Sequence, residues 1–175
     1  MNNVVQRLRQ LWQNKWFNNG VWLVGFLLIY LALRPLMQGD VVRDIAPDFQ
    51  ATSLAGETLR LSDFEGEAVL IHFWATWCPI CEFSRDGIEK IAADYNVISV
   101  ATQSGDDQFL LDYAAEHNMD TRLIVNDADG HLYQLYGARA VPADFIINAD
   151  GEVAFVEVGL SSSWGLRARL WWANR

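Results

Sequence analysis

The sequence predicts an α/β fold in which a central mixed β-sheet is flanked by helices, plus one N-terminal transmembrane helix. Apolar runs of strand length alternate with amphipathic helical segments, a pattern typical of parallel strands joined by helical crossovers. Two more strand-like runs follow, and the Asp-Gly turn between them favours an antiparallel hairpin. A long apolar segment precedes all of these elements, and the 175-residue length suits one domain with such an appendage.

The N-terminal segment has the length and composition of a membrane span. Residues 21–33 are apolar apart from Gly25, and the wider segment 16–37 has 22 residues. As a helix it would be roughly 33 Å long, which matches a hydrocarbon core of about 30 Å. Because the run is apolar on all faces, a buried helix with one apolar stripe fits less well. We expect an uncleaved signal anchor, since Leu-Ala-Leu-Arg-Pro at 31–35 is a poor cleavage site.

Charge predicts the orientation of this anchor. Residues 1–39 contain four basic and no acidic residues, and three of the basic residues precede the apolar run. The positive-inside rule therefore places the N-terminus in the cytoplasm and the domain on the periplasmic, extracytoplasmic side of the inner membrane. That compartment is oxidising, so disulfide chemistry has substrates there. The predicted parts are a cytoplasmic segment at 1–15, the anchor at 16–37, a linker at 38–47 and the domain at 48–175.

The rest of the chain is acidic. The chain has 13 basic and 22 acidic residues in all, so residues 40–175 hold 9 and 22 and carry a formal charge of −13. Such a surface repels phosphate backbones, which disfavours a nucleic-acid partner. Solubility is a sufficient explanation for the acidity itself.

Hydrophobic periodicity predicts the elements of the domain. Residues 68–74 are almost continuously apolar, as expected of a central strand covered on both faces. Residues 88–95 repeat apolar side chains at i, i+3, i+4 and i+7, which indicates an amphipathic helix. Right-handed crossovers would make the first strands parallel, and the hairpin would add antiparallel ones. The other predicted elements are strands at 58–61, 96–102, 123–125, 143–148 and 152–158, and helices at 109–117, 132–136 and 161–174.

The closing helix is rich in tryptophan. Its large apolar residues could pack on the sheet or touch a membrane surface, and we expect packing on the sheet. A serine between residues 161 and 163 would cap the helix. The residues expected to pack are Trp164, Leu170, Trp171 and Trp172.

The two cysteines of the chain lie in the segment Cys78-Pro79-Ile80-Cys81. One local pair closes almost no loop, so a disulfide-stapled scaffold is excluded. The pair follows a predicted strand and starts a helix, where free N–H groups and the helix dipole favour a thiolate at Cys78. Pro79 fits the first helical turn. We expect Cys78 to be exposed and to attack first, and Cys81, one turn deeper, to resolve the mixed disulfide.

Other roles for the pair fit the sequence less well. A structural zinc site needs four ligands, and His72, His117 and His131 form no closely spaced pair. Copper(I) binding, as in a copper- or haem-handling accessory protein, stays an alternative, although no Met-rich or His-rich tract supports it. A peroxidase would need its cysteine in a different setting, and Trp77 beside the helix start disfavours an inert buried pair. We therefore expect redox chemistry without a bound cofactor or metal.

Residues 73–81, Phe-Trp-Ala-Thr-Trp-Cys-Pro-Ile-Cys, resemble the active-site segment of thioredoxins. The match extends to Ala-Pro-Asp-Phe at 46–49, to Tyr136-Gly137 and Val141-Pro142, and to Asp150-Gly151 in the hairpin. It covers nearly all of residues 45–160. The chain is similar to the membrane-tethered, extracytoplasmic TlpA-like branch, and within it to suppressor for copper-sensitivity proteins and to thioredoxins of cytochrome c biogenesis.

This resemblance implies a thioredoxin-like fold and a protein-disulfide oxidoreductase. It implies that Pro142 is a cis proline beside the cysteines, and that the Val141 backbone offers hydrogen bonds to an extended substrate strand. Without a third cysteine, the protein would be recycled by a membrane redox partner. The resemblance favours a reductase over an oxidase, since proteins with this motif span roughly 150 mV and the Pro-Ile dipeptide does not decide the direction.

The chain departs from the family at the residues that move protons. Thioredoxins often carry an aspartate at the position of His72, and TlpA-like members a glutamate at the position of Ser84 and a proline at Asp86. His72 could replace the missing carboxylate as a base, because imidazole titrates near neutral pH. It could equally be an ordinary hydrogen-bonded strand histidine. Glu82, next to Cys81, could tune that cysteine or simply be solvated.

Overall fold

The computed structural model describes residues 20–29 and 41–175. The chain divides into two compact units, Met1–Met37 and Gln38–Arg175. In the first unit, residues 20–29 form a helix whose side chains are mostly exposed. None of the helices within the described residues is long and apolar enough to cross a membrane. The predicted cytoplasmic segment and most of the predicted anchor lie outside the described residues, so the anchor stays a prediction.

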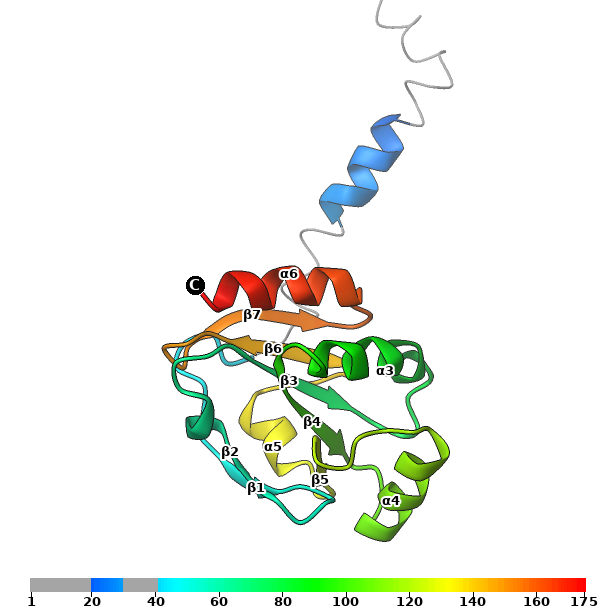
Figure 1. Ribbon diagram of the computed structural model, residues 1–175. Helices are drawn as coiled ribbons and strands as arrows, with labels where there is room; N and C mark the ends of the chain where they lie inside the picture. Colours follow the sequence, from blue (N-terminus) through cyan, green and yellow to red (C-terminus); the bar gives the residue numbers. More distant parts are fainter. Residues whose placement is uncertain (1–19, 30–40) are drawn as a thin grey trace, which may run out of the picture. The chain divides into compact units, whose positions relative to one another are not determined.

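Within residues 41–175, five strands form the central sheet: β3 (Val69–Trp74), β4 (Asn96–Thr102), β5 (Ile124–Asp127), β6 (Ala143–Ile147) and β7 (Val153–Val158). Their order is β5-β4-β3-β6-β7 (Figure 1). β3 pairs in parallel with β4 and β4 with β5, whereas β6 runs antiparallel to β3 and β7 to β6. The predicted mixed sheet is confirmed, and its most apolar run, β3, lies at the centre.

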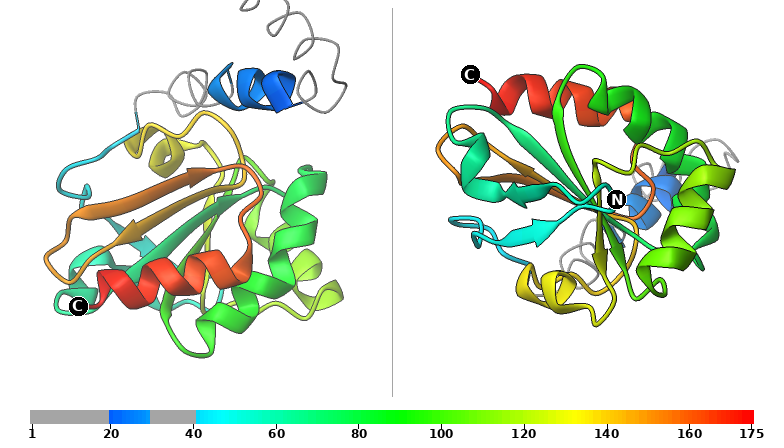
Figure 2. Two further views of the ribbon diagram at one scale, coloured as in Figure 1. Left: turned by 90° about the horizontal axis from the view of Figure 1, so that it is seen from above. Right: turned by 60° about the horizontal axis from the view of Figure 1, so that its bottom comes forward.

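The α-helices of residues 41–175 are α3 (Pro79–Ala92), α4 (Asp107–Glu116), α5 (His131–Leu135) and α6 (Ser163–Ala173). α3 and α6 lie side by side on one face of the sheet, and α5 lies on the other (Figure 1, Figure 2). α4 is capped by Asp106, whose side chain accepts a hydrogen bond from the Phe109 N–H at 2.8 Å. These helices form at the predicted places because each has an apolar stripe that is buried when it packs on the rest of the domain.

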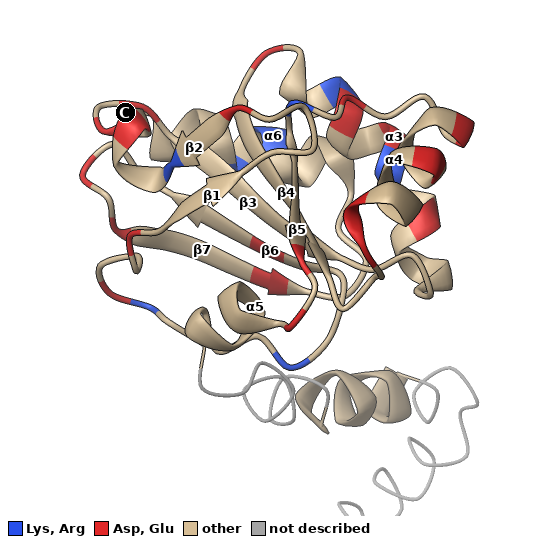
Figure 3. Cartoon of the chain, turned by 90° about the horizontal axis from the view of Figure 1, so that it is seen from below, with Lys and Arg blue, Asp and Glu red and all other residues tan. Residues whose placement is uncertain are grey.

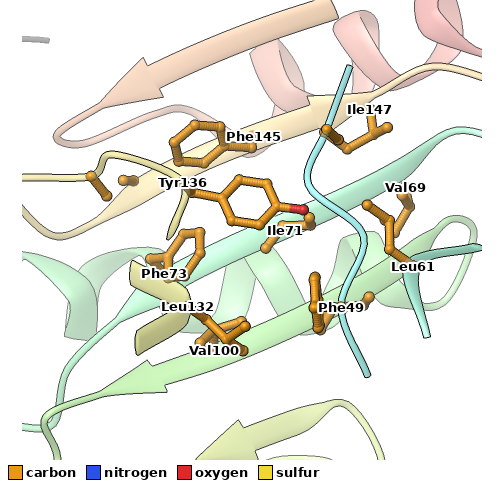
Figure 4. Packing of buried hydrophobic residues seen from close by; sticks show 14 of the residues in the cluster. Phe49, Leu61, Val69, Ile71, Phe73, Val100, Leu132, Tyr136, Phe145 and Ile147 are labelled. Atoms are coloured by element: carbon orange, nitrogen blue, oxygen red, sulfur yellow. The ribbon is translucent and has the colours of Figure 1, made fainter. Parts of the chain in front are cut away.

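The core under α5 is centred on Tyr136 (Figure 4). Phe73 and Phe145 pack against the Tyr136 ring, with centroids 5.6 and 5.2 Å away. The Tyr136 hydroxyl donates a hydrogen bond to the Pro47 carbonyl oxygen at 2.8 Å, which fixes the entrance of the domain to this core. Burial, helped by the nearby Asp48 carboxylate, raises the pKa of Tyr136 far above its ordinary value.

A separate hairpin of β1 (Gln50–Thr52) and β2 (Thr58–Arg60) covers part of this core. The strand predicted at 58–61 is therefore present, but it pairs with β1 and does not join the central sheet. The sequence analysis did not predict β1. A strand of three residues is too short for a clear alternating pattern.

The opposite face of the sheet is buried by α3 and α6, and here one prediction is wrong. Leu170 is buried as expected, together with Leu166 and Ala173. Trp164, Trp171 and Trp172 are instead exposed, Trp164 by 79%. Residues 166, 170 and 173 share one stripe of the helix and face the sheet, so the three tryptophans fall on the other side. Ser162 caps the helix by accepting the Gly165 N–H at 3.1 Å, as the predicted serine cap requires.

Candidate active site

The cysteine pair lies where β3 ends and α3 begins. Cys78 has an extended backbone and is the N-cap residue of α3, with Pro79 in the first helical turn. Cys78 and Cys81 are joined by a disulfide bond, with their Cα atoms 5.3 Å apart, within the usual range for such bonds. The Cys81 backbone N–H points at Cys78 Sγ, 3.2 Å away. This is the geometry in which a helix N-terminus stabilises a thiolate.

The prediction that Cys78 is exposed is wrong for the disulfide-bonded protein. Cys78 is only 7% exposed and Cys81 only 4%. Cys78 is covered because its Sγ lies 3.7 Å from the Val141 carbonyl oxygen, on the loop before β6. In the reduced protein, the Cys78 thiol could donate to this oxygen. Trp77, by contrast, is 61% exposed, and its indole N–H donates to the Gln103 carbonyl at 3.0 Å.

The Val141–Pro142 peptide bond is cis, as the family resemblance implies. The loop that contains it brings Val141 beside Cys78, which is 63 positions earlier in the chain. Val141 is half-buried and packs on the cluster that contains both cysteines. The backbone of this loop is therefore next to the disulfide, where an extended peptide would have to lie.

Ser104 holds the loop before the cysteines in place through hydrogen bonds of its hydroxyl. Its hydroxyl accepts the Thr76 N–H at 3.0 Å and donates to the Thr102 carbonyl at 2.9 Å. Sequence reasoning missed this role. The available signal was its position just after a buried strand, because the carboxyl ends of parallel strands meet at one edge of the sheet.

A row of polar residues crosses the sheet beneath α3. His72 on β3 lies opposite Ser99 on β4 and Asp144 on β6, and Asp144 lies opposite Glu157 on β7. Figure 3 shows these acidic positions within β6 and β7, in addition to the acidic residues of α3 and α4. Glu157 is 2.8 Å from Arg169 of α6, which ends the row. Leu70 and Trp74 flank His72 on the same face, so the row lies between two apolar clusters.

His72 and Asp144 form a buried pair. His72 Nδ1 is 2.7 Å from Asp144 Oδ1, and the two residues are 3% and 2% exposed. Sequence reasoning considered His72 but missed Asp144. A single carboxylate in the apolar run of β6 was a usable signal, because aspartate is almost never fully buried without a partner.

A cavity of about 10 Å³ is lined by both His72 and the resolving cysteine, Cys81. Burial raises the pKa of Glu89 on its wall, although the Asp120 backbone N–H opposes that rise. Trp74 also lines the cavity, and its indole N–H is buried and has no hydrogen-bond partner among the described residues. The lining residues are His72, Trp74, Cys81, Arg85, Ile88, Glu89, Ser99, Tyr113 and Met119.

The remaining candidates lie away from this cavity. The Ser84 hydroxyl donates to the Cys81 carbonyl at 2.9 Å, so it is used within the helix. Glu82 and Asp86 are exposed. The His117 ring packs on Tyr113, with centroids 4.3 Å apart. Residues 20–29 and 41–175 contain no group of three or more His, Cys, Asp or Glu side chains that could hold a metal ion.

Comparisons with known proteins identify the family of the chain. The family model described as the AhpC/TSA family matches residues 42–156. A thioredoxin-like protein of Haemophilus influenzae is 27% identical over 162 residues, 91% of this chain and 96% of the relative. The thiol-disulfide oxidoreductase ResA of Geobacillus kaustophilus is 32% identical over 121 residues, 67% of this chain and 70% of the relative.

A solved structure of a similar protein has the same fold. The proposed thiol:disulfide interchange protein DsbE of Chlorobium tepidum is 27% identical and has a TM-score of 0.66. The similarity covers 78% of this chain and 99% of that one. The predicted thioredoxin-like α/β fold is confirmed.

Proposed function

Because the chain belongs to the AhpC/TSA family, we propose that it is a protein thiol–disulfide oxidoreductase whose Cys78–Cys81 pair exchanges electrons with other proteins. The observation that carries this proposal is the disulfide at the N-terminus of α3, beside the Val141–Pro142 loop. The names of the relatives, thiol-disulfide oxidoreductase ResA and thiol:disulfide interchange protein DsbE, support the same chemistry.

The exchange takes two steps. In the reduced protein, the Cys78 thiolate attacks one sulfur of a substrate disulfide, and the other substrate sulfur leaves as a thiolate. Cys81 then loses its proton and attacks Cys78 Sγ, which breaks the mixed disulfide and releases the second substrate thiolate. Two electrons pass to the substrate, and the protein is left with the Cys78–Cys81 bond. The Cys81 N–H beside Cys78 Sγ stabilises the thiolate of the first step.

The surface around the disulfide suits an unfolded or extended protein segment. Trp77 and Ile80 expose apolar surface next to Cys78. The Val141 backbone would supply hydrogen bonds to an extended substrate strand, since it lies beside Cys78 Sγ. Together they would hold a substrate disulfide in line with Cys78.

We further propose that the protein works as a reductase outside the cytoplasm, held in the inner membrane by residues 16–37. Both cysteines of the chain belong to the active pair, so a separate membrane electron carrier would have to reduce it again. A role in copper tolerance and a role in cytochrome c biogenesis are the two physiological settings that its resemblances suggest. The second is favoured by the likeness to a protein named DsbE.

The test uses the full chain in detergent with three variants in an insulin-reduction assay. Cys78→Ser should abolish exchange, whereas Cys81→Ser should still attack and accumulate mixed disulfides. Glu116→Ala, an exposed carboxylate at the end of α4, should behave as the parent protein. Retained turnover in both cysteine variants would contradict the proposal. Tight, stoichiometric copper(I) binding without any exchange would favour the accessory-protein alternative.

A further inference from the structure

The second step of exchange needs a proton acceptor near Cys81. Cys81 is 4% exposed, so bulk water has little access to its thiol. Burial disfavours the charged thiolate that must form before attack. The two positions where the family resemblance leads us to expect a carboxylate hold Ser84 and His72, and Ser84 already donates its hydroxyl to the Cys81 carbonyl.

The hydrogen bond to Asp144 prepares His72 for this task. A carboxylate accepts hydrogen bonds, so the proton in the 2.7 Å contact lies on His72 Nδ1. Nε2 is then the nitrogen with a free lone pair, and the imidazole is a base in the right tautomer. The in-register pairing of β3 with β6 holds the two side chains together.

The cavity between His72 and Cys81 has the size of a single water molecule. Its volume of about 10 Å³ is close to the minimum that a water needs, roughly 10–15 Å³. A water there would also accept the hydrogen bond of Trp74 Nε1, which otherwise has no partner among residues 20–29 and 41–175. One water could therefore contact the thiol, the imidazole and the indole at once.

We propose that His72, positioned by Asp144, accepts the proton of Cys81 through one water in this cavity and so replaces the missing carboxylate. The proposal rests on the proposed function and names the base of its second step. As the Cys81–Cys78 bond forms, the Cys81 proton passes to water and a water proton passes to His72 Nε2. The electron pair of the broken mixed disulfide leaves on the substrate thiolate. When an electron donor reduces the protein, His72 returns the proton to the departing Cys81 thiolate.

Charged and neutral polar groups from the neighbouring elements surround the imidazole. β6 contributes Asp144, whose Oδ1 lies 2.7 Å from His72 Nδ1. α3 contributes Arg85 and Glu89, which line the cavity. The ion pair of Glu157 on β7 with Arg169 on α6 lies beyond Asp144. Neutral Ser99 of β4 and Tyr113 of α4 complete the wall of the cavity. Glu89 is the rival acceptor, because it lines the same cavity.

The two steps can be measured separately with dithiobis(nitrobenzoate). The reduced full chain should release one thionitrobenzoate when Cys78 attacks and a second when Cys81 resolves the mixed disulfide. His72→Asn keeps an amide N–H for Asp144 but cannot take the proton. It should leave the first phase unchanged and slow the second about 10²-fold near neutral pH. The rate of the second phase in His72→Asn should rise steadily with pH, because only hydroxide then removes the Cys81 proton.

Matched variants decide between acceptors. Asp144→Asn should also slow the second phase, whereas Glu89→Gln should keep the parent pH profile. His131→Asn, the same change at an exposed position on α5, should match the parent protein in both phases. An unchanged second phase in His72→Asn, or loss of the pH profile in Glu89→Gln, would overturn the proposal. If His72→Asn fails to fold, an unchanged second phase in Asp144→Asn overturns it. A parent protein that releases fewer than two thionitrobenzoates per chain would instead refute the proposed function itself.

Discussion

Replacing Asp144 with alanine should cost the domain a measurable part of its stability. Asp144→Ala leaves the buried His72 Nδ1–H without the acceptor that is now 2.7 Å away. An unsatisfied buried donor costs about 1–3 kcal/mol. Asp144→Asn keeps an acceptor oxygen at the same place. Asp144→Asn should therefore lose less than half as much free energy of unfolding as Asp144→Ala.

The assay is equilibrium urea denaturation of the oxidised protein, followed by far-UV circular dichroism. With a slope of about 1–3 kcal/mol per molar urea, a loss of about 2 kcal/mol moves the midpoint by roughly 1 M. Glu116→Ala removes an exposed carboxylate and should shift the midpoint hardly at all. Equal midpoints for Asp144→Ala, Asp144→Asn and the parent would show that the pair contributes no net stability, and would refute this reasoning.

Two further predictions concern the scaffold. Tyr136→Phe removes the hydrogen bond to the Pro47 carbonyl and should lower the free energy of unfolding by about 0.5–1.5 kcal/mol at neutral pH. Because the folded state raises the pKa of Tyr136 above the unfolded value of about 10, its contribution is complete below that pH and fades above it. The difference between parent and variant should therefore narrow in alkaline urea titrations, and a constant difference would contradict the assignment. Asp106→Ala removes the N-cap of α4 and should lower the free energy of unfolding by about 1 kcal/mol, which is measured as a lower Tm. Asp106→Asn can still cap the helix, so its Tm should stay close to that of the parent protein.

The sequence predicts the sheet well because burial leaves a clear pattern. The run at 68–74 becomes the central strand β3, and all six of its residues are buried. Asn96–Thr102 matches its predicted strand at both ends. The short β1 was missed because three residues carry too little periodicity. The exposed tryptophans of α6 were placed wrongly because large apolar side chains were assumed to be buried, while the actual stripe at 166, 170 and 173 decided the helix orientation.

The cysteine pair could be predicted because its chemistry is local, with two cysteines one helical turn apart. The environment of the pair depends on contacts between distant parts of the chain. His72 and Asp144 are 72 positions apart, and only the register of β3 on β6 brings them together. Val141 reaches Cys78 by a similar long-range contact, which explains why Cys78 is less exposed than its position suggests. Neither pairing can be read from spacing within one segment.

The central claim is that Cys78 Sγ forms the mixed disulfide with the substrate. The most direct measurement is mass spectrometry of the Cys81→Ser variant after reaction with a peptide that carries a disulfide. We expect one peptide to be attached by a disulfide to Cys78, and the matching Cys78→Ser variant to carry little or none. Attachment mainly to Cys81 in the Cys78→Ser variant, with no adduct on Cys78, would contradict the account.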